Sequence, residues 1–262
     1  MTYDNVDRRP GKALRIDMTG EFKRIGILYP GYAAEGDFGL LEQRFAGTAA
    51  FEVVHTKIRE DTHSEDSLLD MGRPERLLEG ARRLPPGIAA VVWACTSGSF
   101  IYGWEGAKAQ AADLQEALGV PVSSTSLAFV AAARALGLRR VAIAGTYPED
   151  ITRRFEDFLA KGGLDPVAVT SRGISTATEV GTLSGDDARA LVAAADCPDA
   201  DAVLVPDTAL HTVEAIEALE QAAGKPVLTA NQVSAWDGLR LAGADPMPQG
   251  PGQLFGALAG RS

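Results

Sequence analysis

Two stretches of the chain decide the fold: AVVWACT at 90–96 and AVLVPDT at 202–208. Each is an apolar run that stops at a chemically versatile side chain followed by threonine, Cys95 in the first and Asp207 in the second. An earlier pair, RIGI at 24–27 and RVAI at 140–143, repeats in the same way. The two members are 112 residues apart in the first pair and 116 residues apart in the earlier pair. Because internal repetition sets the architecture, the sequence predicts two related halves of similar length.

Short apolar stretches alternate with longer helical patterns through both halves. Strands that alternate with helices are typical of parallel sheets with right-handed crossovers. We therefore predict an α/β fold of two pseudo-symmetric, four-stranded parallel-sheet units. Strands are expected at 24–29, 52–57, 89–94, 120–122, 140–144, 167–171, 202–205 and 226–228. Helices are expected at 39–46, 65–84, 104–118, 125–136, 149–162, 185–195, 212–223 and 234–242.

The chain is expected to divide into three parts. Residues 1–21 are polar and form an N-terminal extension, 22–118 form the first half, and 119–233 form the second half. The C-terminal helix, within 234–262, is expected to cross back onto the first half. Ligands bind beyond the carboxyl ends of parallel strands, so the active site should lie in the cleft between the halves, with Cys95 facing Asp207.

Composition excludes several classes of protein. Hydrophobic residues make up 46% and charged residues 23%, which is a globular composition. The net charge of −10 argues against nucleic acid and anionic membranes as partners. No apolar run is long enough to span a membrane, and no secretory signal is present, so a cytoplasmic location is expected. Association into a homo-oligomer is left open.

Metal and nucleotide chemistry have no support in the sequence. The two cysteines form no cluster, and in a reducing cytoplasm they are expected to be free thiols. The three histidines, His55, His63 and His211, share no metal-ligand spacing. No glycine-rich phosphate motif follows a strand. We therefore expect no cofactor and no metal.

Cys95 is the first candidate catalytic residue. It ends a strand and precedes a helical pattern, and a helix N-terminus can lower the pKa of a thiol and favour attack or proton transfer. A buried structural cysteine is the alternative. Cys197 lies at a helix end before a proline and is expected to be structural. Asp207 is either an acid, base or substrate-orienting carboxylate opposite Cys95, or a helix N-cap.

The loops after the strands are rich in hydroxyl groups and glycines, which suit a bound carboxylate. Tyr147 is either a core aromatic residue or a phenol that donates to the substrate. His211 follows Asp207 and is a weaker candidate, whereas His55 and His63 are expected at the surface. The candidate carboxylate-binding residues are Thr96, Ser97, Tyr147, Thr208, Gly31 and Tyr32.

Six motifs follow one another along the chain: RIGILYP at 24–30, CTSGSF at 95–100, VAIAGTY at 141–147, DTALHT at 207–212, WDGLRLAG at 236–243 and GQLF at 252–255. In this order and spacing they resemble the aspartate/glutamate racemase superfamily, in the branch of maleate cis–trans isomerases and arylmalonate decarboxylases. The resemblance covers the chain from about residue 24 to residue 255. It implies a cofactor-independent enzyme with two catalytic positions, usually cysteines, that face each other between pseudo-symmetric halves.

The chain departs from both branches at the catalytic positions. Cys95 matches the first position, but the second falls on Asp207, where the isomerases are expected to have cysteine. The first strand-end loop, PGYA at 30–33, lacks the asparagine of the isomerases and is closer to the decarboxylase pattern. The decarboxylases, however, carry glycine at the first position and their single cysteine at the second. This chain reverses that arrangement.

Three hypotheses follow, and all involve a small carboxylate or dicarboxylate. The first is a decarboxylase of a substituted malonate-type acid, in which Cys95 protonates an enediolate that hydroxyl and amide donors stabilise. The second is a cis–trans isomerase or racemase, with Cys95 as nucleophile or base and Asp207 as its acid partner. The third is a non-catalytic carboxylate-binding protein, motivated by the missing second cysteine.

Overall fold

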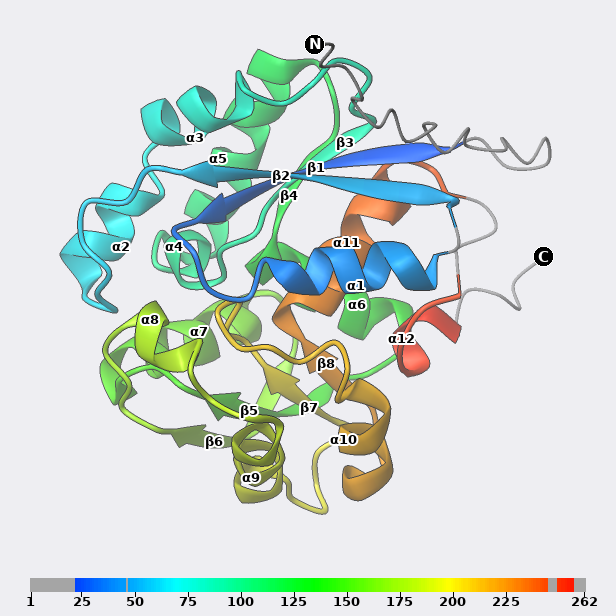
Figure 1. Ribbon diagram of the computed structural model, residues 1–262. Coiled ribbons are helices and arrows are strands. Elements are labelled where there is room, and N and C mark those ends of the chain that lie inside the picture. The colour runs from blue at the N-terminus through cyan, green and yellow to red at the C-terminus, as the bar shows by residue number, and fades with distance from the viewer. Residues whose placement is uncertain (1–21, 46, 245–248, 257–262) are drawn as a thin grey trace, which may run out of the picture.

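The computed structural model of the chain describes residues 22–45, 47–244 and 249–256. The predicted N-terminal extension, 1–21, lies outside the described residues. Figure 1 shows two sheets, the first in the upper half of the molecule and the second in the lower half. Within the described part of the chain, no helix is long and apolar enough to cross a membrane.

Each sheet has four parallel strands, and the two sheets have the same strand order. The first sheet runs β2-β1-β3-β4 and the second runs β6-β5-β7-β8. The two repeated motifs supply the third strand of each sheet, which confirms the predicted pair of α/β units. The strands are β1 (Lys23–Pro30), β2 (Ala49–Thr56), β3 (Ala90–Trp93), β4 (Val122–Ser124), β5 (Arg140–Gly145), β6 (Asp165–Ser171), β7 (Ala202–Val205) and β8 (Val227–Thr229).

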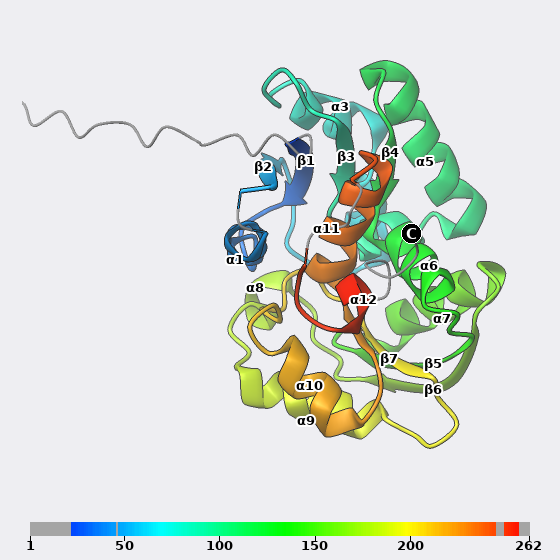
Figure 2. The same cartoon turned by 90° about the vertical axis from the view of Figure 1, so that its right-hand side faces the viewer.

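Helices connect the strands and cover the sheets (Figures 1 and 2). They are α1 (Gly36–Arg44), α2 (Glu65–Met71), α3 (Pro74–Ala81), α4 (Ser97–Phe100), α5 (Gly103–Leu118), α6 (Thr125–Ala135), α7 (Glu149–Lys161), α8 (Ala177–Val180), α9 (Gly185–Ala195), α10 (Ile216–Ala223), α11 (Ala230–Leu241) and α12 (Gln253–Gly256). The sequence did not predict the one-turn helices α4, α8 and α12, which are too short to show a periodic pattern.

The prediction of one helix over 65–84 is wrong, because the chain forms α2 and α3 there. Gly72 ends α2, and Pro74 occupies the start of α3. Proline fits the first turn of a helix but clashes with the preceding turn in a helix interior. The break turns α2 away from α3 and brings Leu68 and Met71 of α2 to the wall of a cavity.

Helix α11 lies between the two halves (Figure 2). It packs against β1, β3 and β4 of the first sheet, against β8 of the second, and along α6. Ten consecutive residues from Ala230 to Leu239 are buried, as expected for a helix covered on all sides. Strand β4 pairs with β3 and so belongs to the first sheet, although the predicted boundary at residue 119 groups it with the second half. The division into domains stays a prediction.

Candidate active site

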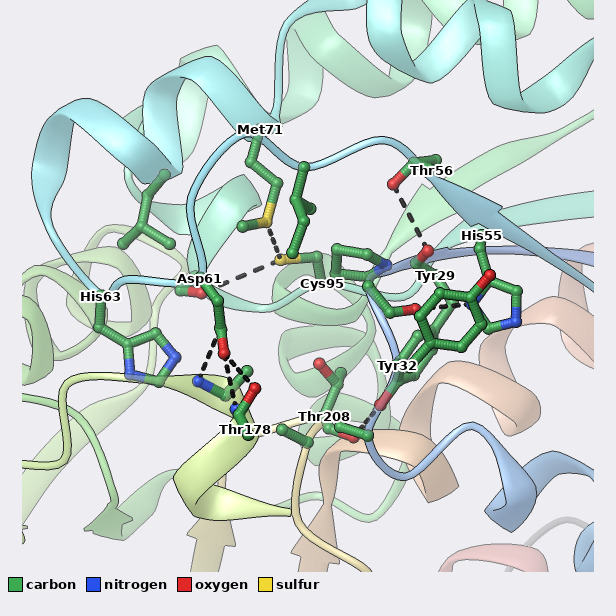
Figure 3. Close-up of a pocket in the computed structure, with 18 of the residues that line it drawn as sticks. Tyr29, Tyr32, His55, Thr56, Asp61, His63, Met71, Cys95, Thr178 and Thr208 are labelled. Atoms are coloured by element: carbon green, nitrogen blue, oxygen red, sulfur yellow. Dashed lines mark hydrogen bonds between the residues drawn. The ribbon is translucent and has the colours of Figure 1, made fainter.

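A cavity of about 510 Å³ opens between the two halves, beyond the carboxyl ends of β1, β3 and β7. Both repeated motifs reach it, since Cys95 and Asp207 are among its lining residues. Apolar side chains of Ile58, Leu68 and Met71 form part of one wall. The cavity has the size of a small-molecule site, and Figure 3 shows Cys95 near its centre. The two candidate catalytic residues therefore share one enclosed space.

Cys95 follows β3 directly and lies in front of α4. Only 3% of its surface is exposed. Its Sγ accepts a hydrogen bond of 3.2 Å from the backbone N–H of Gly98 and lies 3.9 Å from the Ser97 hydroxyl and 3.8 Å from Met71 Sδ. A Cβ at Gly98 would lie 3.0 Å from Sγ, so glycine permits the close approach of α4 to the thiol. The start of α4 thus holds the sulfur in place.

Burial raises the pKa of the Cys95 thiol to about 12, and the negative charge of Asp207 adds to the rise. The hydrogen bonds from Gly98 and Ser97 act in the opposite direction but are outweighed. The expectation that the helix start lowers this pKa is therefore wrong. The free-energy cost of removing the thiolate from water exceeds the stabilisation that the hydrogen bonds from Gly98 and Ser97 provide. At neutral pH, Cys95 carries its proton.

Asp207 occupies the equivalent place after β7, with 3% of its surface exposed. One carboxylate oxygen accepts a hydrogen bond of 2.5 Å from the Thr146 hydroxyl, and the other accepts one of 2.9 Å from the backbone N–H of Ala209. Thr146 comes from the loop after β5, so two neighbouring strand ends fix the carboxylate. No regular helix starts here, since α10 begins at Ile216. The carboxylate is therefore held by the loops after β5 and β7 and lines the cavity.

The first half holds the loop that follows Asp207. The Tyr29 hydroxyl at the end of β1 donates to the Thr208 carbonyl oxygen at 2.7 Å, and the Asn231 amide donates to the same oxygen at 3.1 Å. Tyr29 in turn accepts from the backbone N–H of Ala34 at 3.0 Å. All of these groups are buried, where hydrogen bonds are strong and costly to lose. The two sides of the site are therefore fixed relative to each other.

The predicted carboxylate-binding residues fall into two sets. Ser97 and Thr208 line the cavity together with Cys95 and Asp207. Thr96 and Tyr147 are buried beside them but are not among the lining residues. The Tyr147 hydroxyl donates to the Pro206 carbonyl oxygen at 2.9 Å, while the Thr96 hydroxyl has no hydrogen-bond partner in the described part of the chain. Burial raises the pKa of Tyr147 well above its ordinary value, so its phenol stays protonated.

Gly31 and Tyr32 form part of the opposite side of the cavity, in the loop after β1. Gly31 has a φ of +63°, a left-handed conformation that favours glycine. Its carbonyl oxygen lies 2.6 Å from Nδ1 of His55. Tyr32 is 76% exposed and stacks on the His55 ring at a centroid distance of 4.0 Å. In Figure 3 this stacked pair lies away from the Asp61 and Thr178 side of the cavity.

Asp61 and His63 are among the lining residues that the sequence did not indicate. His63 was expected at the surface, but only 8% of it is exposed, because the segment between β2 and α2 folds over the cavity. His55 also lines the cavity and is partly buried. The chain here has no strand or helix pattern, so nothing in the sequence indicated which way these side chains point.

The other candidates lie elsewhere. His211 is half-exposed, with Nδ1 3.5 Å from Oδ1 of the buried Asp37, and is not a lining residue. Cys197 is partly buried and also lies outside the cavity, and both cysteines are free thiols, as expected. Among the described residues, no group of three histidine, cysteine or acidic side chains could hold a metal ion. Besides Cys95 and Asp207, the cavity is lined by the ionisable side chains of His55, Lys57, Asp61, His63 and Arg83.

Known proteins resemble the chain in sequence. A profile of the arylmalonate decarboxylase family matches residues 72–255. Arylmalonate decarboxylase from Bordetella bronchiseptica is 37% identical over 188 residues, which cover 69% of this chain and 77% of that protein. The profile match at 72–255 includes both repeated motifs, and with them Cys95 and Asp207.

Solved structures share the fold. A double mutant of arylmalonate decarboxylase, with a glycine-to-cysteine and a cysteine-to-serine change, superposes with a TM-score of 0.79 at 30% identity, over 89% of this chain and 98% of the mutant, which was solved in its liganded form. A cysteine-to-serine mutant of maleate cis–trans isomerase from Nocardia farcinica, with a covalently bound succinylcysteine intermediate, gives 0.77 at 25% identity over 89% and 98% of the two chains. The chain belongs to the arylmalonate decarboxylase family.

Proposed function

We propose that the protein is a cofactor-independent decarboxylase of a substituted malonate-type acid, with Cys95 as the proton donor. The observation that carries this proposal is a buried thiol with a pKa raised to about 12, in a cavity shared with a second catalytic position. Membership of the arylmalonate decarboxylase family supports the reaction class. A thiol that keeps its proton at neutral pH is suited to give that proton to carbon.

The reaction needs two kinds of surroundings. One carboxylate leaves as CO₂ when its C–C bond breaks, and the electron pair stays on the remaining carboxylate as an enediolate. Departure is favoured where the leaving carboxylate is poorly solvated, and the wall of Ile58, Leu68 and Met71 offers such surroundings. The enediolate needs preorganised donors, which we assign to the hydroxyls of Ser97 and Thr208.

Thr96 and Tyr147 are proposed as a further layer of the same pocket. The Thr96 hydroxyl is buried without a partner, so a substrate oxygen that displaces a neighbouring group could use it. The Tyr147 hydroxyl is committed to the Pro206 carbonyl, and it would have to turn to meet the substrate. In the last step the S–H bond of Cys95 breaks, a C–H bond forms at the α-carbon, and the thiolate regains a proton from solvent.

A second reaction, cis–trans isomerisation or racemisation of a small dicarboxylate, has one observation in its favour. The mutant of maleate cis–trans isomerase that this chain resembles in structure carries a covalently bound succinylcysteine intermediate, so a cysteine forms the covalent bond in that protein. Here Cys95 would have to ionise first, against burial and the charge of Asp207. We therefore rank decarboxylation above isomerisation, and both above non-catalytic binding of a carboxylate.

A substrate panel in D₂O, followed by NMR, tests the proposal. The panel contains arylmalonates, alkylmalonates, maleate, and both enantiomers of aspartate and glutamate. We expect CO₂ loss from a substituted malonate with one deuterium at the new C–H position. Fumarate formation from maleate would favour isomerisation, and α-deuteration of an amino acid would favour racemisation. Location in the cytoplasm and association into an oligomer stay predictions.

A further inference from the structure

The segment between β2 and α2 closes one wall of the cavity by hydrogen-bonding to the second half. Asp61 accepts hydrogen bonds from the backbone N–H groups of Ala177 and Thr178, both at 2.9 Å, and from the Thr178 hydroxyl at 2.5 Å. The His63 backbone N–H donates to the Ser175 carbonyl at 2.7 Å. Asp61, His63 and Thr178 all line the cavity. We name Asp61 and His63 the acceptor pair, because each side chain has a hydrogen-bond acceptor.

His63 presents a free ring nitrogen to the cavity. Its Nδ1 lies 3.0 Å from the Ile174 carbonyl oxygen, which can only accept, so Nδ1 carries a proton and donates. Nε2 of neutral His63 is then a hydrogen-bond acceptor. Within the described part of the chain, the ring's hydrogen bond is the one at Nδ1, although only 8% of the residue is exposed. The ring is held edge-on against Tyr147 at a centroid distance of 4.9 Å, so it cannot turn away without losing this contact.

Asp61 adds a second acceptor beside this ring. Burial alone would raise its pKa, but the hydrogen bonds from Thr178 and Ala177 outweigh burial, so the pKa is lowered and the group is ionised at neutral pH. An ionised carboxylate can accept about four hydrogen bonds, and the described residues supply three. Figure 3 shows the Asp61 carboxylate and the His63 ring on the same side of the cavity.

We propose that the acceptor pair recognises the α-substituent of the substrate, and that this substituent carries a hydrogen-bond donor, a hydroxyl or an ammonium group. An apolar substituent would desolvate both side chains, leaving Nε2 of His63 without a donor and adding no hydrogen bond to the three that Asp61 already accepts, and an anionic substituent would be repelled by Asp61. The inference deepens the proposed function and rests on it. It separates this chain's substrate from a malonate with a plain aryl or alkyl group.

Matched substrate pairs test the assignment. Decarboxylation of hydroxymethylmalonate is compared with that of methylmalonate, and 3-hydroxyphenylmalonate with phenylmalonate, as kcat/KM ratios. A hydrogen bond to a charged group predicts a preference of about 10- to 100-fold for the donor-bearing member of at least one pair. Equal or lower kcat/KM for the donor-bearing member in both pairs would overturn the proposal.

Substitutions of single residues show which side chains cause the preference in kcat/KM for the donor-bearing substrate. His63→Phe keeps a ring against Tyr147 but removes the acceptor, and Asp61→Asn removes the charge, so both should move the ratio towards one. His55→Gln is the matched control, because His55 lines the same cavity near Tyr32 and not near the acceptor pair. Its ratio should stay that of the wild type. An unaltered ratio in both His63→Phe and Asp61→Asn, each shown to be folded by thermal unfolding, would refute the assignment.

A binding measurement separates this inference from the proposed function. If the wild-type protein releases CO₂ from none of the four compounds, the proposed decarboxylation fails, but recognition can still be measured. Thermal shifts with hydroxymethylmalonate and methylmalonate compare their affinities without turnover. A larger shift with hydroxymethylmalonate, lost in His63→Phe, supports the acceptor pair. Equal shifts in the wild-type protein contradict it.

Discussion

The protonated state of Cys95 can be tested by alkylation with iodoacetamide. With a pKa of about 12, roughly one molecule in 10⁴ has a thiolate at pH 8, against roughly a quarter for a cysteine of ordinary pKa near 8.5. The more basic thiolate is intrinsically more nucleophilic, which raises its rate of alkylation about 25- to 60-fold for a Brønsted slope of 0.4–0.5. The net expectation is alkylation about 40- to 100-fold slower than that of a free thiol, before any loss from burial.

The assay follows both cysteines by mass spectrometry of their peptides at several pH values. Cys197 gives an internal comparison, and in urea both cysteines should react at one rate. Asp207→Asn should accelerate alkylation of Cys95, because the charge of Asp207 contributes to the raised pKa. If folded Cys95 reacts at pH 7 as fast as a free thiol or faster, its pKa is not raised.

Three further predictions concern the same site. Tyr147→Phe should lower kcat about 10²- to 10³-fold, the usual cost of one oxyanion donor. It should retain the fold with a loss of about 1–3 kcal/mol in the free energy of unfolding, because the buried Pro206 carbonyl loses its donor; unchanged kcat would make Tyr147 a core residue. Gly98→Ala places a Cβ 3.0 Å from Cys95 Sγ, so denaturant unfolding should show a loss of about 1–3 kcal/mol, and wild-type stability would contradict this crowding. Exchange of the thiol between halves, Cys95→Gly with Asp207→Cys, should invert the configuration of the product on chiral chromatography, since the proton would reach the opposite face of the enediolate; retained configuration would disprove delivery from Cys95.

The sequence predicted the architecture because the repeat carries it. Apolar runs at 90–94 and 202–205 are buried on both faces of a parallel sheet, so they read as continuous hydrophobic strands. Their ends bring Cys95 and Asp207 to one cavity by topology alone. Breaks between helices were harder to predict from the sequence. The break before Pro74 was missed, although proline in the middle of a helical pattern indicates a boundary.

The electrostatics of the site could not be predicted from local sequence. The N–H of Gly98 does reach Cys95, as a helix start should, but complete burial of the thiol depends on side chains from distant parts of the chain, such as Met71. His63 was expected to be exposed because its burial also depends on residues that are distant in sequence. Its surroundings are Ile174 and Tyr147, which are distant in sequence and come close only when the halves associate.

The central claim is that Cys95 protonates carbon after loss of CO₂, and that Asp207 shapes the pocket without donating the proton. The most direct measurement is turnover of the best malonate in the panel by Cys95→Ala and by Asp207→Asn, followed by NMR in D₂O. If Cys95 is the proton donor, Cys95→Ala gives no deuterated product and Asp207→Asn gives substantial product. Equally severe losses in both variants would indicate a two-residue isomerase or racemase. Full activity of Cys95→Ala would show that Cys95 does not donate the proton to carbon.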